Sequence, residues 1–312
     1  MKRFYKNAIS FSILFAIVFV LIDILSMRDS SKYMLAKWTD SESFIAGNVG
    51  AGEIIPYIEK VQTKDGTTKL LLGDSVCHQI FNGLQECNPE WTIVGSNGAV
   101  TMAGQYILAK EYLDAHPEAT DVFLILLPES FSRTYDTLWG YQYVVMPFAE
   151  TNTLNNLDAD TIKTLKKTYG GIFLNPGIVK LIDRSAMNRK VYLNYIHDHS
   201  KDYVLKNYFE LADQYVYKIY EMCNEKNVNF HLYPCPVADA KIDYNNSLLN
   251  DFSQSKIYEI NPDYMDMVYY FPVEEANDTT HFSGEYANQE HFNSIIRQMF
   301  EGLEILDMLK LQ

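Results

Sequence analysis

The sequence predicts an α/β fold with a mainly parallel, doubly wound sheet, preceded by one membrane-spanning helix. Three observations lead to this expectation. An apolar stretch at residues 8–26 is interrupted only by Asp23. Short apolar runs, the first at residues 69–72, alternate with segments of helical periodicity. The chain has 312 residues, 47% of them hydrophobic, which is enough for one large globular domain.

The apolar stretch has the properties of a membrane anchor. At 1.5 Å per residue it extends about 28 Å, close to the thickness of a hydrocarbon core. Lys2, Arg3 and Lys6 precede it, so we expect a single-pass protein with a cytoplasmic N-terminus and an exported remainder. Asp23 falls near the outer end, where a charge costs less than at the centre. A cleaved signal peptide is the alternative, but residues 24–28 lack a small-x-small cleavage site. A buried soluble helix is disfavoured because the stretch is apolar on every face.

The rest of the chain divides into a linker and one domain. We expect a cytoplasmic tip and anchor at 1–28, a stalk or linker at 29–66, and the globular domain at 67–312 with an insertion at about 131–202. The formal net charge of −14 argues against nucleic acid as a partner and against tight binding to anionic lipid. Neutral or cationic substrates are easier to accommodate, and we expect no cofactor and no metal.

The elements of the domain follow from the pattern of apolar residues. We expect, in chain order, a strand at 69–72, a helix at 101–115, a strand at 121–127, a helix at 203–224, and strands at 229–235 and 267–271. A last helix has the apolar spacing of a face packed on a sheet, at Phe292, Ile295, Ile296, Met299, Phe300, Leu303 and Leu306.

Two short motifs supply the residues that a serine esterase needs. Gly73-Asp74-Ser75 follows the first strand, so the Ser75 hydroxyl would project from a helix start at the carboxyl edge of the sheet. His281 is the candidate base, and Asp278, three residues earlier, would orient its imidazole from the same face of a helical turn. The alternative is that Asp74 only caps a helix and that Asp278 and His281 form a surface turn.

These motifs resemble those of the SGNH (GDSL) hydrolase family, in its membrane-anchored cell-envelope form. The family carries its nucleophile in Gly-Asp-Ser and its acid and base in Asp-x-x-His, which match Ser75, Asp278 and His281. The resemblance covers roughly residue 70 to the C-terminus. It implies a three-layer, flavodoxin-like α/β/α domain that acts on esters. The family's second motif gives a glycine N–H to the oxyanion hole, and Gly98 is its best match, beside the N–H of Ser75.

The third motif of the family, Gly-x-Asn-Asp, has no match after the third strand, where Leu127-Pro128-Glu129-Ser130 stands. One oxyanion donor is therefore unassigned, and Asn97 is the candidate substitute. Loss of one donor lowers turnover by about 100- to 1000-fold without abolishing chemistry. Glu129 is either a substrate contact or a solvated loop carboxylate. Aromatic residues of the insertion, including Trp139 and Tyr141, form either a glycan-binding cap near the site or the insertion's own small core.

Four cysteines would lie outside the cytoplasm, where disulfides persist. Three pairings are possible, and Cys223 and Cys235 are close enough in sequence to pair, although buried free thiols fit equally well. Cys77, two residues beyond Ser75, is interpreted as helix packing.

The sequence thus predicts a membrane-anchored, extracytoplasmic serine esterase or O-acyltransferase. Its substrates would be acyl esters, chiefly acetyl esters, of cell-envelope or exported polysaccharide, and its partners the acylated glycan, the membrane and a membrane-bound acyltransferase. One alternative is a non-catalytic protein of the same fold that binds a glycan or docks onto such an acyltransferase. The missing third motif supports this alternative. A lipase or thioesterase is a further alternative.

Overall fold

The structure is a computed structural model that describes residues 2–26, 51–137, 139–183 and 186–311. Its centre is a parallel four-stranded sheet in the order β2–β1–β3–β4. The prediction of an α/β fold with a mainly parallel sheet is therefore confirmed. The strands are β1 (Lys69–Gly73), β2 (Trp91–Gly95), β3 (Asp121–Leu126) and β4 (Asn229–Pro234).

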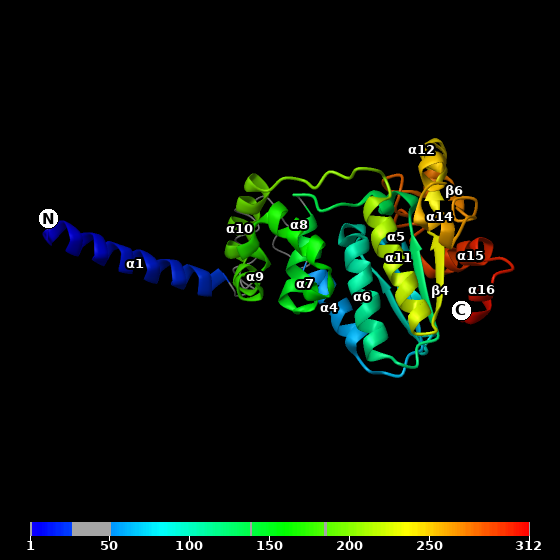
Figure 1. The fold of residues 1–312 in the computed structure, drawn as a ribbon, viewed down its shortest axis with the longest axis horizontal. Coiled ribbons are helices and arrows are strands. Elements are labelled where there is room, and N and C mark those ends of the chain that lie inside the picture. Colours follow the sequence, from blue (N-terminus) through cyan, green and yellow to red (C-terminus); the bar gives the residue numbers. More distant parts are fainter. Residues whose placement is uncertain (1, 27–50, 138, 184–185, 312) are drawn as a thin grey trace.

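Helices cover both faces of this sheet (Figure 1). In β1, Leu70 and Leu72 face one apolar core and Leu71 faces the other, as the alternation of side chains along a strand requires. Burial on both faces explains why β1, β2 and β3 are largely apolar runs, whereas the edge strand β4 is partly exposed. The first face is covered by α4 (Ala51–Gln62), α6 (Thr101–Ala115) and α11 (Glu210–Glu225), and the second by α5 (Ser75–Phe81), α15 (Gln289–Met299) and α16 (Glu304–Met308).

The strand order places the loops that follow β1, β2 and β3 at one edge of the sheet. From β1 the chain passes through α5 on one face to β2, and from β2 through α6 on the other face to β3. The connections that leave the neighbouring strands β1 and β3 lead to opposite faces of the sheet. In open α/β sheets, ligands bind at the carboxyl ends of the strands at such a point. The motif residues after β1 lie at this point.

The predicted linker at 29–66 is wrong in its second half. Helix α4 occupies residues 51–62, and Ile54, Ile58 and Val61 are buried in the core shared with α6. The globular domain therefore includes residues 51–62, which precede the predicted boundary at residue 67. Residues 29–50 lie outside the described residues.

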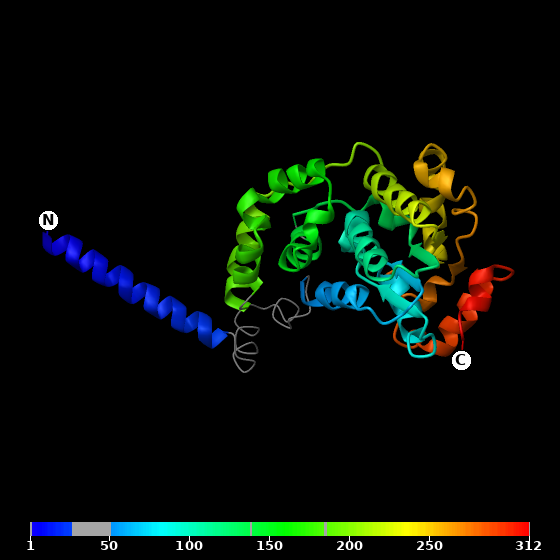
Figure 2. The ribbon, with the colours of Figure 1, turned by 60° about the horizontal axis from the view of Figure 1, so that its bottom comes forward.

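The segment predicted to be an insertion, 131–202, forms a layer of short helices that packs on the rest of the domain (Figure 2). Phe148 lies against Gly104 of α6, where an added Cβ would be 3.0 Å from its ring. Tyr135, Tyr141 and Phe148 are buried in the same core as α6, so they pack the interior. The helices of this region are η3 (Pro128–Ser132), η4 (Tyr141–Val145), α7 (Met146–Glu150), η5 (Thr153–Asn156), α8 (Ala159–Tyr169), η6 (Gly171–Leu174), α9 (Pro176–Asp183) and α10 (Ala186–His199).

Several other boundaries differ from the expectation. Helix α6 is confirmed at its predicted ends, but α11 begins at Glu210, seven residues later than predicted. The strand predicted at 267–271 is reduced to β6 (Tyr270–Phe271), which pairs with β5 (Val237–Ala238) in a separate two-stranded sheet. The predicted last helix is broken before α16, near Gly302, whose φ of 78° ends a helix readily. The remaining short elements are η1 (Asn82–Leu84), η2 (Gly98–Val100), η7 (Asp239–Lys241), α12 (Ile242–Ser247), α13 (Leu249–Phe252), α14 (Lys256–Ile260) and η8 (Val273–Glu275).

Helix α1 (Lys2–Ser26) projects from the domain and contacts it at α10 (Figure 1). Its segment Phe4–Leu25 has 22 residues and is long and apolar enough to cross a membrane, with nearly all of its side chains exposed. At 1.5 Å per residue it spans about 33 Å, compared with about 30 Å for a hydrocarbon core. Asp23, the charged residue near its C-terminal end, is buried.

Candidate active site

The turn after β1 places Ser75 at the carboxyl edge of the sheet, as the sequence predicts. Ser75 is the first residue of α5, and Asp74 caps that helix by accepting hydrogen bonds from the N–H groups of Val76 at 3.1 Å and Cys77 at 3.2 Å. The Ser75 side chain is half-buried. Asp74 therefore caps the helix, as one interpretation of the sequence predicted, and the Ser75 side chain next to it is still partly accessible.

Glycine is required at position 73 because there is no room for a side chain, and not because of its backbone angles. A Cβ at this position would lie 2.2 Å from the carbonyl oxygen of Ile125 and 2.4 Å from the Sγ of Cys77. Both distances are far below van der Waals contact, and the first involves a backbone atom of β3 that cannot move aside. The close approach of β1, β3 and α5 at the nucleophile turn therefore depends on this glycine.

The structure brings Ser75, His281 and Asp278 together. The Ser75 Oγ lies 2.7 Å from His281 Nε2, and His281 Nδ1 lies 2.9 Å from Asp278 Oδ2 and 3.1 Å from Asp278 Oδ1. A carboxylate only accepts hydrogen bonds, so Nδ1 carries the ring proton and Nε2 accepts from the Ser75 hydroxyl. This is the tautomer in which an imidazole can remove the serine proton.

The turn that carries His281 is a strained loop and not the helical turn that we expected. Thr279 has a φ of 66°, in the left-handed region that β-branched residues avoid. Asp278 Oδ1 accepts from the N–H groups of Thr280 at 3.2 Å and His281 at 2.8 Å, which closes the loop on itself. The base of the loop is fixed by a bridge between Ala276 and Phe282. The carboxylate thus orients both the backbone and the imidazole of His281.

Hydrogen bonds keep Asp278 ionised. Partial burial opposes its charge, but the backbone N–H and the ring of His281, together with the Thr280 N–H, outweigh that effect and lower the pKa of Asp278 below its usual value. An ionised carboxylate stabilises the imidazolium that forms when His281 takes a proton. The electrostatics of the pair therefore favour proton abstraction from Ser75.

Two glutamines position this site, and sequence reasoning missed both. Gln79, one turn after Ser75 on α5, binds Phe282 twice: its Oε1 accepts from the Phe282 N–H at 3.1 Å and its Nε2 donates to the Phe282 carbonyl at 3.3 Å. Gln105 on α6 donates through Nε2 to the Gly73 carbonyl at 3.0 Å. The i, i+4 spacing from Ser75 is the one sequence signal that could have indicated Gln79.

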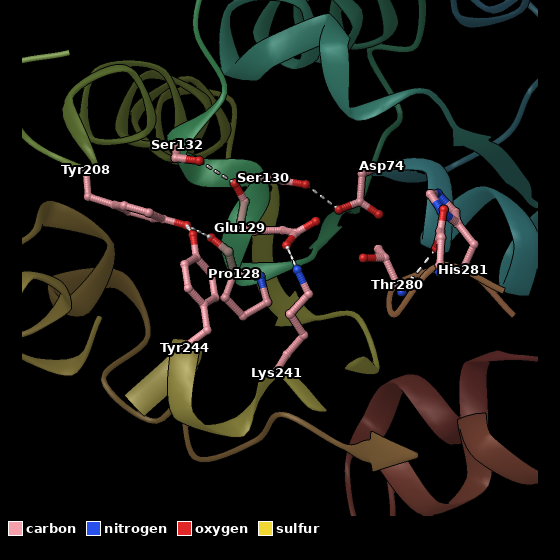
Figure 3. Close-up of polar contacts among 11 residues, drawn as sticks. Asp74, Pro128, Glu129, Ser130, Ser132, Tyr208, Lys241, Tyr244, Thr280 and His281 are labelled. Carbon is pink, nitrogen blue, oxygen red and sulfur yellow. Dashed lines mark hydrogen bonds and ion pairs between the residues drawn. The ribbon is translucent and has the colours of Figure 1, made fainter. Parts of the chain in front are cut away.

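Asp74 joins the nucleophile turn to the loop after β3 (Figure 3). Its Oδ2 accepts from the Leu127 N–H at 2.6 Å and from the Ser130 hydroxyl at 2.7 Å. Complete burial raises the pKa of Asp74, and the hydrogen bonds from Leu127, Ser130, Cys77 and Val76 oppose that rise. Ser130, which stands in the segment where the third motif was expected, therefore anchors the turn that precedes Ser75.

The predicted oxyanion residues lie on η2, beside this network. Gly98 is the first residue of η2, so its N–H has no acceptor within that helix. A Cβ built on Gly98 would be 3.7 Å from the Cβ of Asp74. Asn97 caps η2 through its side-chain oxygen, which accepts from the Ala99 N–H at 2.9 Å. Its Nδ2 group is the part that can donate elsewhere.

A cluster of charged and phenolic side chains extends from the loop after β3. Lys241 Nζ lies 2.8 Å from Glu129 Oε2, and both side chains are about one quarter exposed. Tyr208 donates to the Pro128 carbonyl at 3.3 Å and shares a 2.9 Å hydrogen bond with Tyr244. Figure 3 shows the Glu129–Lys241 pair between these tyrosines and the loop that carries His281.

The two predicted aromatic contacts have different outcomes. Tyr141 is 1% exposed and donates its hydroxyl to the Phe173 carbonyl at 2.8 Å, so it cannot reach a substrate and that prediction is wrong. Trp139 is 40% exposed and packs edge-on against Tyr143 of η4, which contacts η2. Its role in binding stays a prediction.

All four cysteines are free thiols. Cys223 and Cys235 lie in different cores, so the pairing suggested by their sequence separation does not occur. Cys77 is fully buried, and burial raises the pKa of its thiol, which removes it as a competing nucleophile. Cys235 lies with its Sγ 3.6 Å from Asp74 Oδ1 and belongs to the core under the nucleophile turn.

Comparison of the chain with protein-family models, with curated proteins and with solved structures gave no match. Within the described residues, no group of three or more His, Cys, Asp and Glu side chains has an arrangement that could hold a metal ion.

Proposed function

We propose that this protein is a membrane-anchored serine esterase or O-acyltransferase of the SGNH type. The observation that carries the proposal is the hydrogen-bonded series Ser75–His281–Asp278, at 2.7 Å and 2.9 Å, at the carboxyl edge of a parallel sheet. Two residues 206 positions apart in sequence form the first of these bonds. An alcohol, an imidazole and a carboxylate in this order form the hydrogen-bonded series that activates a serine.

In the proposed mechanism Ser75 Oγ attacks the acyl carbonyl carbon while His281 Nε2 takes its proton. The N–H groups of Ser75 and Gly98 bind the oxyanion of the tetrahedral intermediate. Collapse of this intermediate breaks the bond to the alcohol, which leaves with the proton from His281, and the acyl group remains on Ser75. A second alcohol or a water then attacks the acyl-enzyme by the reverse sequence. Water gives the free acid and a sugar hydroxyl gives a new ester.

The side chains beside the site favour a hydroxyl-rich substrate. Glu129 accepts hydrogen bonds, Lys241 donates them, and Tyr244 presents a partly exposed ring to which Lys241 also lies close, 5.5 Å from the ring centroid. Sugar hydroxyls match such paired donors and acceptors, and aromatic rings pack on sugar faces. We therefore propose acyl esters, chiefly acetyl esters, of an exported or cell-envelope polysaccharide as substrates.

The location follows from α1. We propose that its segment Phe4–Leu25 crosses the membrane once, with Lys2, Arg3 and Lys6 in the cytoplasm and the domain outside. The catalytic domain would then act close to the membrane surface, where polysaccharide under export emerges and where a membrane-bound acyltransferase could hand over acyl groups.

A covalent serine probe tests the proposal. Full-length protein in detergent is treated with a fluorophosphonate, which captures activated serines, and the labelled residue is found by mass spectrometry. We expect labelling of Ser75 in the wild type, none in Ser75→Ala, and wild-type labelling in Ser132→Ala, the matched control from the loop after β3. Folded wild type that is not labelled, or Ser75→Ala labelled equally, refutes catalysis and leaves a glycan-binding or acyltransferase-docking protein.

The acyl chain separates the esterase from a lipase or thioesterase. We expect hydrolysis of acetylated oligosaccharides and of 4-nitrophenyl acetate to exceed that of long-chain esters and thioesters. A preference for acyl chains of eight carbons or more would assign the protein to the lipase or thioesterase class while keeping the Ser75 mechanism.

A further inference from the structure

An exposed arginine, Arg133, lies beside Gly98 of η2 and has no ionic partner among the described residues. Arg133 follows η3, and its N–H donates to the Ser130 carbonyl at 3.2 Å, so the same short helix that anchors Asp74 also fixes the backbone of Arg133. Its side chain is exposed. In the part of the chain that the structure describes, no carboxylate forms an ion pair with its guanidinium.

The Nε atom of Arg133 lies close to Gly98. A methyl group built on Gly98 would lie 3.7 Å from Arg133 Nε, 3.5 Å from Ser130 Oγ and 3.7 Å from the Cβ of Asp74. Three segments therefore meet at this point: the nucleophile turn, the glycine of η2 and the end of η3. Arg133 is the cation of this junction, and all its N–H groups donate.

The charge balance of the region makes this unpaired cation informative. The protein carries a net charge of −14, Asp74 belongs to the nucleophile turn, and Asp278 is hydrogen-bonded to the imidazole beside Ser75. Negative charges raise the energy of an oxyanion at Ser75. Lys241, the other nearby cation, is held by Glu129 at 2.8 Å, so its charge is neutralised. Arg133 is therefore the cation that can compensate a negative charge beside Gly98.

We propose that the Arg133 guanidinium donates a hydrogen bond to the tetrahedral oxyanion formed on the acyl-Ser75 carbonyl, which completes the oxyanion site that the missing third motif leaves short of one donor. This inference rests on the proposed esterase function. The intermediate places one negative charge on the former carbonyl oxygen, and the N–H groups of Ser75 and Gly98 together with the guanidinium share it. No bond to Arg133 forms or breaks, and its proton stays on the guanidinium.

Arg133 fits this role better than Asn97. The side-chain oxygen of Asn97 caps η2 at 2.9 Å, so its Nδ2 group can donate only in the direction that the cap imposes. The amide also carries no net charge. A guanidinium contributes both a donor and a full positive charge, and hydrogen bonds that involve an ionised group are about twice as strong as neutral ones.

The test uses full-length protein in detergent with 4-nitrophenyl acetate, a neutral ester that offers Arg133 no anionic group other than the developing oxyanion. The variants are Arg133→Ala, Arg133→Gln and Arg133→Lys. Arg297→Ala on α15 removes an exposed arginine elsewhere and serves as the matched control. Each is assayed for kcat and KM, with and without added guanidinium ion, and for fluorophosphonate labelling of Ser75.

We expect Arg133→Ala and Arg133→Gln to lower kcat by about 10- to 100-fold with little change in KM, less than a preorganised backbone donor because solvent screens an exposed charge. Arg133→Lys should keep part of the rate, guanidinium ion should restore part of it to Arg133→Ala, and Arg297→Ala should match the wild type. Because Arg133 is exposed, its variants should keep the wild-type circular dichroism spectrum.

Two results would overturn the role of Arg133. One is a kcat of Arg133→Ala within twofold of the wild type, and the other is a loss of rate that guanidinium ion does not restore. Either result, with Ser75 still labelled in the wild type, leaves the proposed function intact. Wild-type protein that is neither labelled nor active refutes the esterase function and the role of Arg133 together.

Discussion

The hydrogen bond from Ser130 to Asp74 is the most informative contact to remove. Both residues are buried, with Asp74 fully inaccessible and Ser130 2% exposed, and the Oγ–Oδ2 distance is 2.7 Å. Ser130→Ala deletes the one hydroxyl donor of this carboxylate and leaves the backbone donors at Val76, Cys77 and Leu127 in place. The variant therefore removes the side-chain link between the loop after β3 and the nucleophile turn, while the backbone link from Leu127 remains.

The size of the effect follows from the charge of the acceptor. Hydrogen bonds to charged groups contribute about 1.5–3 kcal/mol, so we expect Ser130→Ala to lower the free energy of unfolding by about 2 kcal/mol. For a domain of this size 1 kcal/mol shifts Tm by about 2–4 °C, which predicts a fall of about 4–8 °C. The Ser75 turn should also be less well held, and fluorophosphonate labelling of Ser75 should slow.

The pH dependence has a definite sign. Burial raises the pKa of Asp74 in the folded protein above its usual value of 3.8, so folding favours the neutral acid. The corresponding stability is present below pH 3.8 and is lost as the pH rises through the folded pKa. Ser130 limits this loss because it binds the ionised form. Stability should therefore fall more steeply with rising pH in Ser130→Ala than in the wild type.

The assay is thermal unfolding of full-length protein in detergent, followed by circular dichroism between pH 4 and pH 8. Ser132→Ala is the matched control, because Ser132 lies in the same short helix and donates to the neutral Glu129 carbonyl at 2.8 Å. That variant should lose about 1 kcal/mol or less, with the pH profile of the wild type. Equal Tm values for the two variants across this range would contradict the argument.

Further predictions concern Asp278, which orients the base, the Glu129–Lys241 pair and the membrane helix α1. Asp278→Asn should lower kcat by about 10³- to 10⁴-fold, because an amide holds the wrong imidazole tautomer. Because the pKa of Asp278 is lowered in the folded protein, this carboxylate stabilises the fold above its usual pKa of 3.8, and the stabilisation is lost as the pH falls through the folded pKa. The Tm difference between Asp278→Asn and the wild type should therefore vanish at acid pH. Glu129→Gln and Lys241→Met should each lower kcat/KM about tenfold for an acetylated oligosaccharide and leave that for 4-nitrophenyl acetate unchanged; equal losses on both esters would remove the pair from glycan binding. Full-length protein should stay in the membrane pellet after carbonate extraction, and Ile17→Lys, which costs about 3 kcal/mol at the bilayer centre, should release a measurable fraction.

Local patterns determined the elements of the central domain. The apolar runs at β1 and β3 were visible in the sequence because strands buried on both faces need apolar residues at nearly every position, whereas β4 lies at the edge of the sheet and is partly exposed. We also predicted α6 with its observed ends, because in the chain it lies between the buried strands β2 and β3. Elements at the periphery were harder, and α4 was missed because its apolar positions lie in a segment interpreted as a polar linker.

The candidate triad was identified from residue types, but for a partly incorrect structural reason. We expected Asp278 and His281 on a helical turn, whereas a loop with Thr279 at a φ of 66° brings them together. The need for Gly73 comes from Ile125 of the neighbouring strand, with which a side chain at this position would clash. In both cases the sequence motif was informative while the conformation depended on residues elsewhere in the chain.

The sequence alone determined the candidate reactive groups, the apolar character of α1 and the alternation of strands and helices, because these depend on local side-chain chemistry and periodicity. Tertiary structure decided what those groups contact. The Asp74–Ser130 bond joins residues 56 positions apart, and the Gln79–Phe282 bonds join residues 203 positions apart. Tyr141 became a core residue and Arg133 a neighbour of Gly98 in the same way. Such contacts depend on how the layers pack around the sheet, and no local pattern encodes that packing.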